Sequence, residues 1–333
     1  MMFKELFVNS YVPYSQNSTY NEFYSTDEIN TKPDILQSQF MSKLVVTYIK
    51  QKLHCKIVKE YIFDNTRVSL TMYCVNKKSC IDHFIKVMNF YIYVLNQIRH
   101  TPVINIIIYN TNLKKVFPAA PNLILNENNV NSGVTMFNDN TIVIYRKEEL
   151  YKVLLHELIH LYQLDFHTYD VSYDKYLMST CGIHVKTPHK NRNNPLALFE
   201  SYTESLACYG HILTHALFHS HSIDESDIQQ VINRETKYYM LQASKVFKYG
   251  KLYENAHVFS YYIAKAALYR SFDRFIGFVD ANHIRLDTET KKYAYLDMLT
   301  NIVLDSLFWK ALKTIRTRQI FLSSLKMSKL KWS

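Results

Sequence analysis

Hydrophobic positions follow two different patterns along the chain. Up to residue 145, short β-branched runs alternate with longer stretches in which apolar residues recur every three or four positions. The helices predicted there are 37–52 and 81–99. The predicted strands are 56–63 and 67–75, which flank a turn at Asp64-Asn65, then 103–109 and, as one or two strands, 135–145. After Pro195 no further proline occurs, and the apolar spacing is helical almost to the end. We therefore expect an α+β fold in which a mixed β-sheet lobe with helices precedes a mostly helical C-terminal lobe.

Three parts follow from these patterns. Residues 1–35 carry scattered aromatic and polar side chains and two prolines, which predicts an irregular N-terminal arm. Residues 36–167 form the predicted α/β lobe, and residues 168–333 form the predicted helical lobe with a basic C-terminal segment. With 333 residues, of which 48% are hydrophobic, the chain can bury a substantial core.

A helix is expected directly after the last predicted strand. It carries His156-Glu157-Leu158-Ile159-His160, a HExxH motif. Side chains four residues apart share one face of a helix, so both imidazoles could bind one metal ion. Glu157 could then take a proton from water at the metal, which predicts hydrolysis of an amide bond. The alternative is an ordinary core helix whose histidines are buried and hydrogen-bonded.

A zinc hydrolase needs a third protein ligand, and the residues soon after the motif do not supply a familiar one. Gln163 and Phe166 stand where a metzincin has glycine and histidine, so that pattern fails. Asp165 and His167 could reach the metal only if the helix ended there in a sharp turn.

Glu200 and Glu204 are the better candidates for the third ligand. They lie four residues apart on one face of a helix predicted to begin just after Pro195. Two carboxylates one turn apart repel each other, so a shared cation would explain their placement. The alternative is a solvated acidic face, although the neighbouring Phe199 and Leu206 favour a helix that is at least half buried.

A HExxH helix followed by ExxxE on a later helix resembles the gluzincin metallopeptidases, which have a zincin fold. The resemblance implies that His156, His160 and Glu200 are ligands of one Zn²⁺ ion. It also implies that Glu157 is the general base. Glu204 would accept a hydrogen bond from a ligand histidine and so fix its tautomer.

The same resemblance implies a donor for the oxyanion, which gluzincins take from a tyrosine or histidine of the helical lobe. Tyr261 and His257 are the candidates in this chain. The chain departs from the family at Glu204, where many gluzincins have aspartate. The strand before the HExxH helix, in 135–145, would be the edge to which an extended peptide substrate adds as an extra strand.

A closer resemblance rests on three stretches of sequence. Residues 131–149, 199–204 and 258–262 are similar to inferred metallopeptidases encoded by large DNA viruses. The similarity covers roughly residues 100–270 and implies a viral protein. Five glycines beside 27 tyrosines agree with an AT-rich coding sequence.

Cysteine usage and apolar runs bear on location. The chain has an odd number of cysteines and no CxxC spacing, which favours a reducing compartment and opposes a disulfide framework. These residues are Cys55, Cys74, Cys80, Cys181 and Cys208. Residues 1–15 show no signal peptide, and no apolar run reaches the length of a membrane span. We expect an intracellular protein, in host cytoplasm or packaged in a virion.

The net charge of +10 is concentrated at the C-terminal end, where residues 310–333 hold seven basic residues and no acid. This segment could bind nucleic acid or an anionic membrane surface. We favour the alternative of a basic terminal helix docked through its apolar residues.

Four histidines, His211, His215, His219 and His221, form a further cluster. A second metal site is one interpretation. We favour packing or solvent-exposed histidines instead, because His211 lies too far along the helix from Glu200 to share its zinc ion.

The sequence thus predicts a zinc-dependent metallopeptidase that acts on peptide or protein substrates. Two alternatives stay open. One is a catalytically inactive, metal-stabilised virion or interaction protein of zincin fold. The other is a nucleic-acid-binding protein that acts through residues 310–333. Nothing in the sequence indicates the oligomeric state.

Overall fold

The computed structural model describes residues 2–17, 19–33, 41–76, 81–117, 125–183, 194–220, 224–249, 256–317 and 324–330. The chain folds into two compact units. The first, which we call the sheet unit, comprises Lys4–Lys114 and Asn131–Tyr162; the second, the helical unit, comprises Met1–Phe3, Lys115–Val130 and Gln163–Ser333. The chain therefore leaves the sheet unit after Tyr162, whereas the expected boundary followed residue 167. No helix in the described part of the chain is long and apolar enough to cross a membrane.

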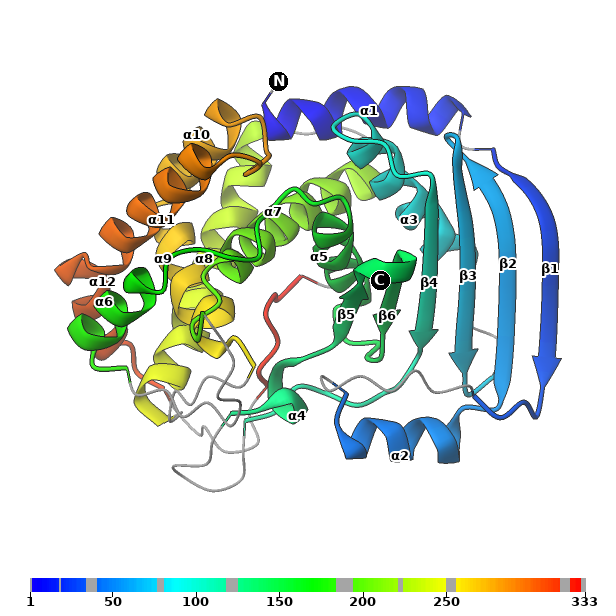
Figure 1. The fold of residues 1–333 in the computed structure, drawn as a ribbon, viewed down its shortest axis with the longest axis horizontal. Helices are drawn as coiled ribbons and strands as arrows, with labels where there is room; N and C mark the ends of the chain where they lie inside the picture. Colours follow the sequence, from blue (N-terminus) through cyan, green and yellow to red (C-terminus); the bar gives the residue numbers. More distant parts are fainter. Residues whose placement is uncertain are drawn as a thin grey trace. The chain divides into compact units, whose positions relative to one another are not determined.

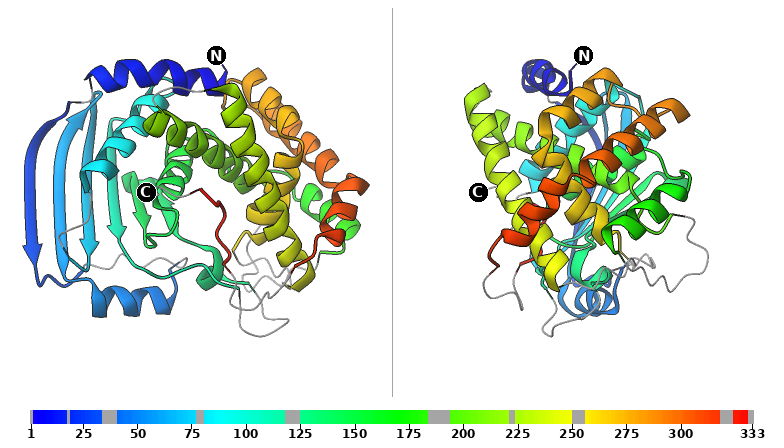
Figure 2. Two further views of the ribbon diagram at one scale, coloured as in Figure 1. Left: turned by 180° about the vertical axis from the view of Figure 1, so that it is seen from behind. Right: turned by 90° about the vertical axis from the view of Figure 1, so that its left-hand side faces the viewer.

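The sheet unit contains one mixed six-stranded sheet, whose strands lie side by side in Figure 1 and in the left view of Figure 2. In spatial order the strands are β1 Asn21–Ile29, β2 Cys55–Phe63, β3 Thr66–Cys74, β4 Val103–Tyr109, β6 Thr141–Ile144 and β5 Gly133–Met136. Strands β1, β2 and β3 pair antiparallel, while β3, β4 and β6 pair parallel. Strand β5 runs antiparallel to β6.

The position of the edge strand corrects one prediction. Residues 135–145 were expected to supply the edge strand that leads into the HExxH helix. That strand is β6, which lies between β4 and β5, so the prediction is wrong and β5 is the edge strand at this end of the sheet, with β1 at the other. The reason is a tight hairpin: a 3₁₀ turn at Phe137–Asp139 and Asn140 at φ 51° reverse the chain between the two strands.

The described helices of the sheet unit are α1 Phe3–Asn17, α2 Lys43–Lys52, α3 Ile81–Asn96 and α5 Leu150–Leu161. Helix α5 packs against α3, β5 and β6. The predicted turn between β2 and β3 is confirmed, with Asp64 at φ 48° and Asn65 at φ 57°, as a tight hairpin requires. The predicted helix 37–52 corresponds to α2, and residues 34–40 lie outside the described residues.

The prediction of an irregular arm over residues 1–35 is wrong, because α1 and β1 form there. Helix α1 buries Phe7 and Tyr14, whose rings contact Phe90 of α3. Strand β1 pairs with β2 along its length but is mostly exposed. The contacts of α1 are tertiary and β1 has no alternating apolar pattern, so neither element leaves a local signal in the sequence.

The helical unit follows the predicted pattern. Its described elements are α4 Glu127–Val130, α6 Ser172–Cys181, α7 Phe199–Ser220, α8 Glu225–Tyr249, a π-helical stretch at Phe259–Ala264, α9 Lys265–Arg270, α10 Phe272–Ala281, α11 Glu289–Val303 and α12 Ser306–Thr314. Helix α7 is buried over most of its length. Ser324 forms an isolated antiparallel bridge with Val116. The two units together confirm the α+β class and the mixed sheet.

Candidate metal-binding and catalytic residues

The HExxH motif lies in the C-terminal half of α5. Helix α5 begins at Leu150, directly after Glu149, whose φ of 64° is left-handed. The predicted succession of a strand and the HExxH helix is thereby confirmed, since β6 ends at Ile144. His156, Glu157 and His160 are all buried.

The two motif histidines face each other. The Nε2 atoms of His156 and His160 are 3.1 Å apart, and the ring planes are inclined by 78°. Two nitrogen ligands at about 2.0–2.1 Å from a tetrahedral Zn²⁺ ion would lie about 3.3 Å apart. The observed separation therefore fits two ligands of one ion. It also fits a hydrogen bond between neutral imidazoles, which is what the ordinary core helix requires.

Glu157 contacts strand β5. The hydroxyl oxygen of Thr135 lies 2.8 Å from Glu157 Oε2 and 3.0 Å from the Glu157 backbone oxygen. Gly133, two residues earlier on β5, lies close enough that an added Cβ would be 2.8 Å from Glu157 Oε1. Sequence reasoning used residues 131–135 only for a family resemblance and missed this contact.

Glu200 lies in the first turn of α7, where the positive end of the helix dipole stabilises a carboxylate. It is buried, and it is contacted by both predicted oxyanion donors. The Tyr261 hydroxyl donates to Glu200 Oε2 at 3.2 Å, and His257 Nε2 is 3.9 Å from Glu200 Oε1. His257 has a left-handed φ of 57°, and the Tyr261 amide donates to its carbonyl at 2.9 Å. The structure thus brings Glu200, Tyr261 and His257 together.

The π-helical stretch that carries Tyr261 is tied to the start of α7. Ser260 donates its hydroxyl towards the carbonyls of Leu196 and Ala197, at 2.9 and 3.0 Å. Ala197 has a positive φ of 47°, so α7 begins at Phe199 rather than directly after the proline. π-helical turns, such as the one at Phe259–Ala264, are frequent at functional sites.

A buried carboxylate fixes the same turn from α6. Asp174 Oδ2 accepts the Leu196 amide at 2.9 Å, and Asp174 Oδ1 accepts the Tyr169 hydroxyl. The Tyr169 hydroxyl in turn accepts the Leu198 amide at 2.9 Å. Burial raises the pKa of Asp174 to about 6, although both hydrogen bonds to the carboxylate oppose this shift.

Glu204 has a partner that the sequence did not predict. Lys265 Nζ is 3.0 Å from Glu204 Oε1, and both side chains are 1% exposed. Lys265 also donates to the Met327 carbonyl at 2.8 Å and lies 4.4 Å from the centre of the Tyr239 ring. Cys208 donates to the same Glu204 oxygen at 3.6 Å. The predicted hydrogen bond between Glu204 and a ligand histidine stays a prediction.

One sign of this ion pair was readable in the sequence. Lys265 is a single charge within the apolar run from Tyr261 to Tyr269, where a solvated lysine is not expected. Nothing in the spacing connects it with Glu204, which lies 61 residues away.

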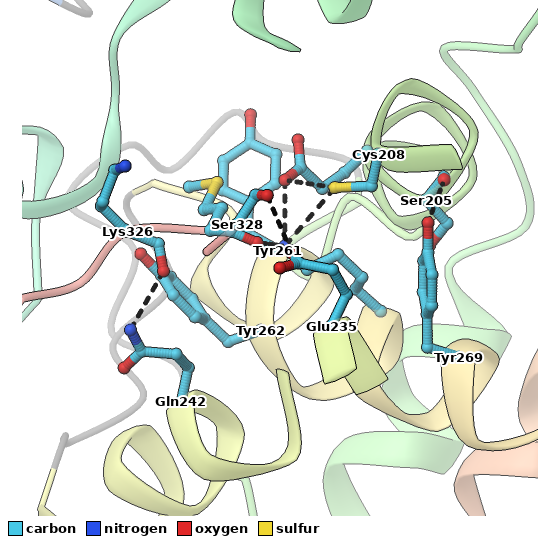
Figure 3. Close-up of polar contacts among 12 residues, drawn as sticks. Ser205, Cys208, Glu235, Gln242, Tyr261, Tyr262, Tyr269, Lys326 and Ser328 are labelled. Atoms are coloured by element: carbon cyan, nitrogen blue, oxygen red, sulfur yellow. Dashed lines mark hydrogen bonds and ion pairs between the residues drawn. The ribbon is translucent and has the colours of Figure 1, made fainter. Parts of the chain in front are cut away.

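The C-terminal segment 324–330 lies beside this ion pair. Ser328 donates to Glu235 Oε2 at 2.8 Å, and Gln242 donates to the Lys326 carbonyl at 3.1 Å (Figure 3). Leu325 and Met327 are buried. The favoured interpretation was a docked basic terminal helix. Residues 324–330 are docked but they are not helical, so the helix expected there is wrong, while residues 318–323 and 331–333 lie outside the described residues.

The remaining candidates differ in exposure. The Asp165 carboxylate accepts the Thr203 hydroxyl at 2.8 Å, and His167 is exposed. His211 is buried in α7. The rings of His215 and His219 stack at 4.0 Å, and His221 is not among the described residues.

The metal ligands that the gluzincin resemblance implies are divided between the two units. His156 and His160 lie on α5 of the sheet unit, and Glu200 lies on α7 of the helical unit. All three side chains are buried.

The chain matches no protein-family model and no curated protein.

Proposed function

We propose that the protein is a zinc-dependent metallopeptidase. His156, His160 and Glu200 would hold one Zn²⁺ ion, and Glu157 would act as the general base. The observation that carries this proposal is the HExxH helix. Its two histidines are buried, with their Nε2 atoms 3.1 Å apart. The buried carboxylate of Glu157, which follows the first histidine, accepts a hydrogen bond from Thr135. A helix whose histidines serve only the core does not require a carboxylate at this position.

A bound zinc ion supplies Lewis acidity, which polarises a carbonyl group and makes water acidic enough to lose a proton near neutral pH. In the proposed reaction, the Glu157 carboxylate accepts that proton and returns it to the leaving amine. The water oxygen would bond to the carbonyl carbon, and the C–N bond would break as the proton reaches the nitrogen, which leaves a carboxylic acid and an amine. Burial of Glu157 limits competing contact with bulk water.

The substrate is proposed to be an extended peptide. Strand β5 is the edge strand next to α5, so its outer backbone groups could pair with a peptide. Tyr261 and His257 stay proposed donors to the oxyanion. Their contacts with Glu200 also support a role in orienting that carboxylate.

The test is a pair of measurements on wild-type protein and Glu157→Gln. Each is loaded with zinc, assayed for metal content, and screened against a peptide library. We expect one zinc ion per chain in both, cleavage by the wild type, and a loss of cleavage of about 10³-fold or more in the variant. An active Glu157→Gln protein would refute the assignment. Zinc binding without cleavage of any peptide would favour the inactive, metal-stabilised protein instead.

A further inference from the structure

We propose that strand β5 positions the general base, with Thr135 holding the Glu157 carboxylate and Gly133 leaving the space that it occupies. The inference rests on the proposed function, because it concerns how Glu157 is prepared for proton transfer. Both β5 residues act through Glu157 and are positioning residues.

Thr135 binds the part of Glu157 that reacts. Its hydroxyl has one proton, and two acceptors of Glu157 lie within reach: the carboxylate Oε2 at 2.8 Å and the backbone oxygen at 3.0 Å. A hydrogen bond to an ionised carboxylate is the stronger of the two. The hydroxyl therefore fixes the rotation of the carboxylate about its last bond while leaving it able to accept a proton.

Gly133 is required for space rather than for backbone conformation. Its φ is not positive, so another residue could adopt the same backbone. An added Cβ, however, would lie 2.8 Å from Glu157 Oε1 and 3.0 Å from Val153 Cγ1. Side chains almost never approach so closely, so a larger residue would push the carboxylate, or the strand, out of place.

The register of β5 explains why these two residues act together. Gly133 pairs with Ile144 and Thr135 pairs with Ile142 on β6. Alternate residues of a strand share one face, so Gly133 and Thr135 both face α5. Val134 and Met136, which alternate with them, pack against a hydrophobic cluster that includes Val45, Tyr73 and Tyr109. One face of β5 thus holds Glu157, and the other anchors the strand.

The decisive comparison is Thr135→Val against Thr135→Ser, assayed with the library peptide that the wild type cleaves fastest. Valine keeps the shape but removes the hydroxyl, whereas serine keeps the hydroxyl. We expect kcat to fall by about 10–100-fold in Thr135→Val, with KM, zinc content and melting temperature little changed. Thr135→Ser should stay within about threefold of wild type. A Thr135→Val enzyme with wild-type kcat, or a serine variant as slow as the valine variant, would overturn the proposal.

Gly133→Ala tests the space requirement separately. Its matched control is Gly277→Ala in α10, because an added Cβ there meets nothing within 4 Å. We expect Gly133→Ala to lose kcat and keep its zinc, and Gly277→Ala to behave as wild type. Equal kcat in the two variants would contradict the role of Gly133.

The failure of this inference can be told from failure of the proposed function. If the wild type cleaves peptides, Glu157→Gln does not, and Thr135→Val is unaffected, only the positioning role fails. If the wild type is inactive, or Glu157→Gln is active, both proposals fail.

Discussion

Glu157 in α5 and Glu204 in α7 are both buried carboxylates, but their surroundings differ. Glu157 accepts a hydrogen bond from the neutral Thr135 hydroxyl, whereas Glu204 forms an ion pair with Lys265. A neutral hydroxyl orients a carboxylate through one hydrogen bond, whereas an ammonium group at 3.0 Å adds an attraction between opposite charges. The ion pair therefore fits a structural anchor at Glu204, and the Thr135 hydroxyl fits the orientation of the proposed general base at Glu157.

The largest change in stability is expected when that ion pair is broken. Lys265→Met keeps the length of the side chain but leaves Glu204 buried without its ammonium partner. The free energy of unfolding should fall by about 3–5 kcal/mol, as measured by chemical denaturation. Lys310→Met on the exposed side of α12 is the control and should change it by less than about 0.5 kcal/mol. Equal stabilities of the two variants would show that the pair does not anchor the helical unit.

Asp174 shows what burial does to a carboxylate held by neutral groups. Burial raises its pKa from 3.8 to about 6, so the folded state binds the proton more tightly than the unfolded state. The stabilisation by protonated Asp174 is full below pH 3.8 and is lost as the pH rises through about 6. Relative to Asp174→Asn, which cannot ionise, the wild type should lose about 3 kcal/mol between these pH values.

Denaturation of wild type and Asp174→Asn at pH 3.5, 5 and 7 measures this difference. A stability difference that does not change with pH would mean that the Asp174 carboxylate is not protonated more readily in the fold. It would also weaken the contrast between carboxylates with neutral donors and the ion-paired Glu204, because burial alone would then not raise the pKa of a carboxylate held by neutral donors.

The smallest effect is expected for an exposed pair of the same kind as Lys265 and Glu204. Lys59 Nζ lies 2.7 Å from Glu22 Oε2 between strands β2 and β1, where both side chains reach solvent. Glu22→Gln should lower the free energy of unfolding by only about 0.2–1 kcal/mol, and less at high salt. A loss as large as that in Lys265→Met would show that burial does not set the strength of these pairs.

Local patterns were sufficient for much of the fold. Strand β4 has the predicted bounds, 103–109, because a β-branched run between turn residues is a strong signal. The turn at Asp64 and Asn65 was predicted from residue types that tolerate positive φ. Helix α1 could not be found in this way, because its burial depends on contacts with Phe90 of another helix.

In the candidate site, too, local spacing predicted some residues, and contacts between distant parts of the chain determined the others. His156, Glu157 and His160 are predictable because a fixed spacing on one helix brings their side chains together. Thr135 and Lys265 were missed, since their partners lie 22 and 61 residues away and neither residue type is tied to its partner by spacing. The edge position of β5 also required the hairpin geometry at Asn140, which the sequence pattern did not specify.

The most direct test of the central claim is diffraction from zinc-loaded crystals, with data collected on both sides of the zinc absorption edge. We predict one anomalous peak within about 2.0–2.2 Å of His156 Nε2, His160 Nε2 and a Glu200 carboxylate oxygen. An anomalous peak elsewhere, or a zinc-loaded protein in which Glu200 is not a ligand, would contradict the account.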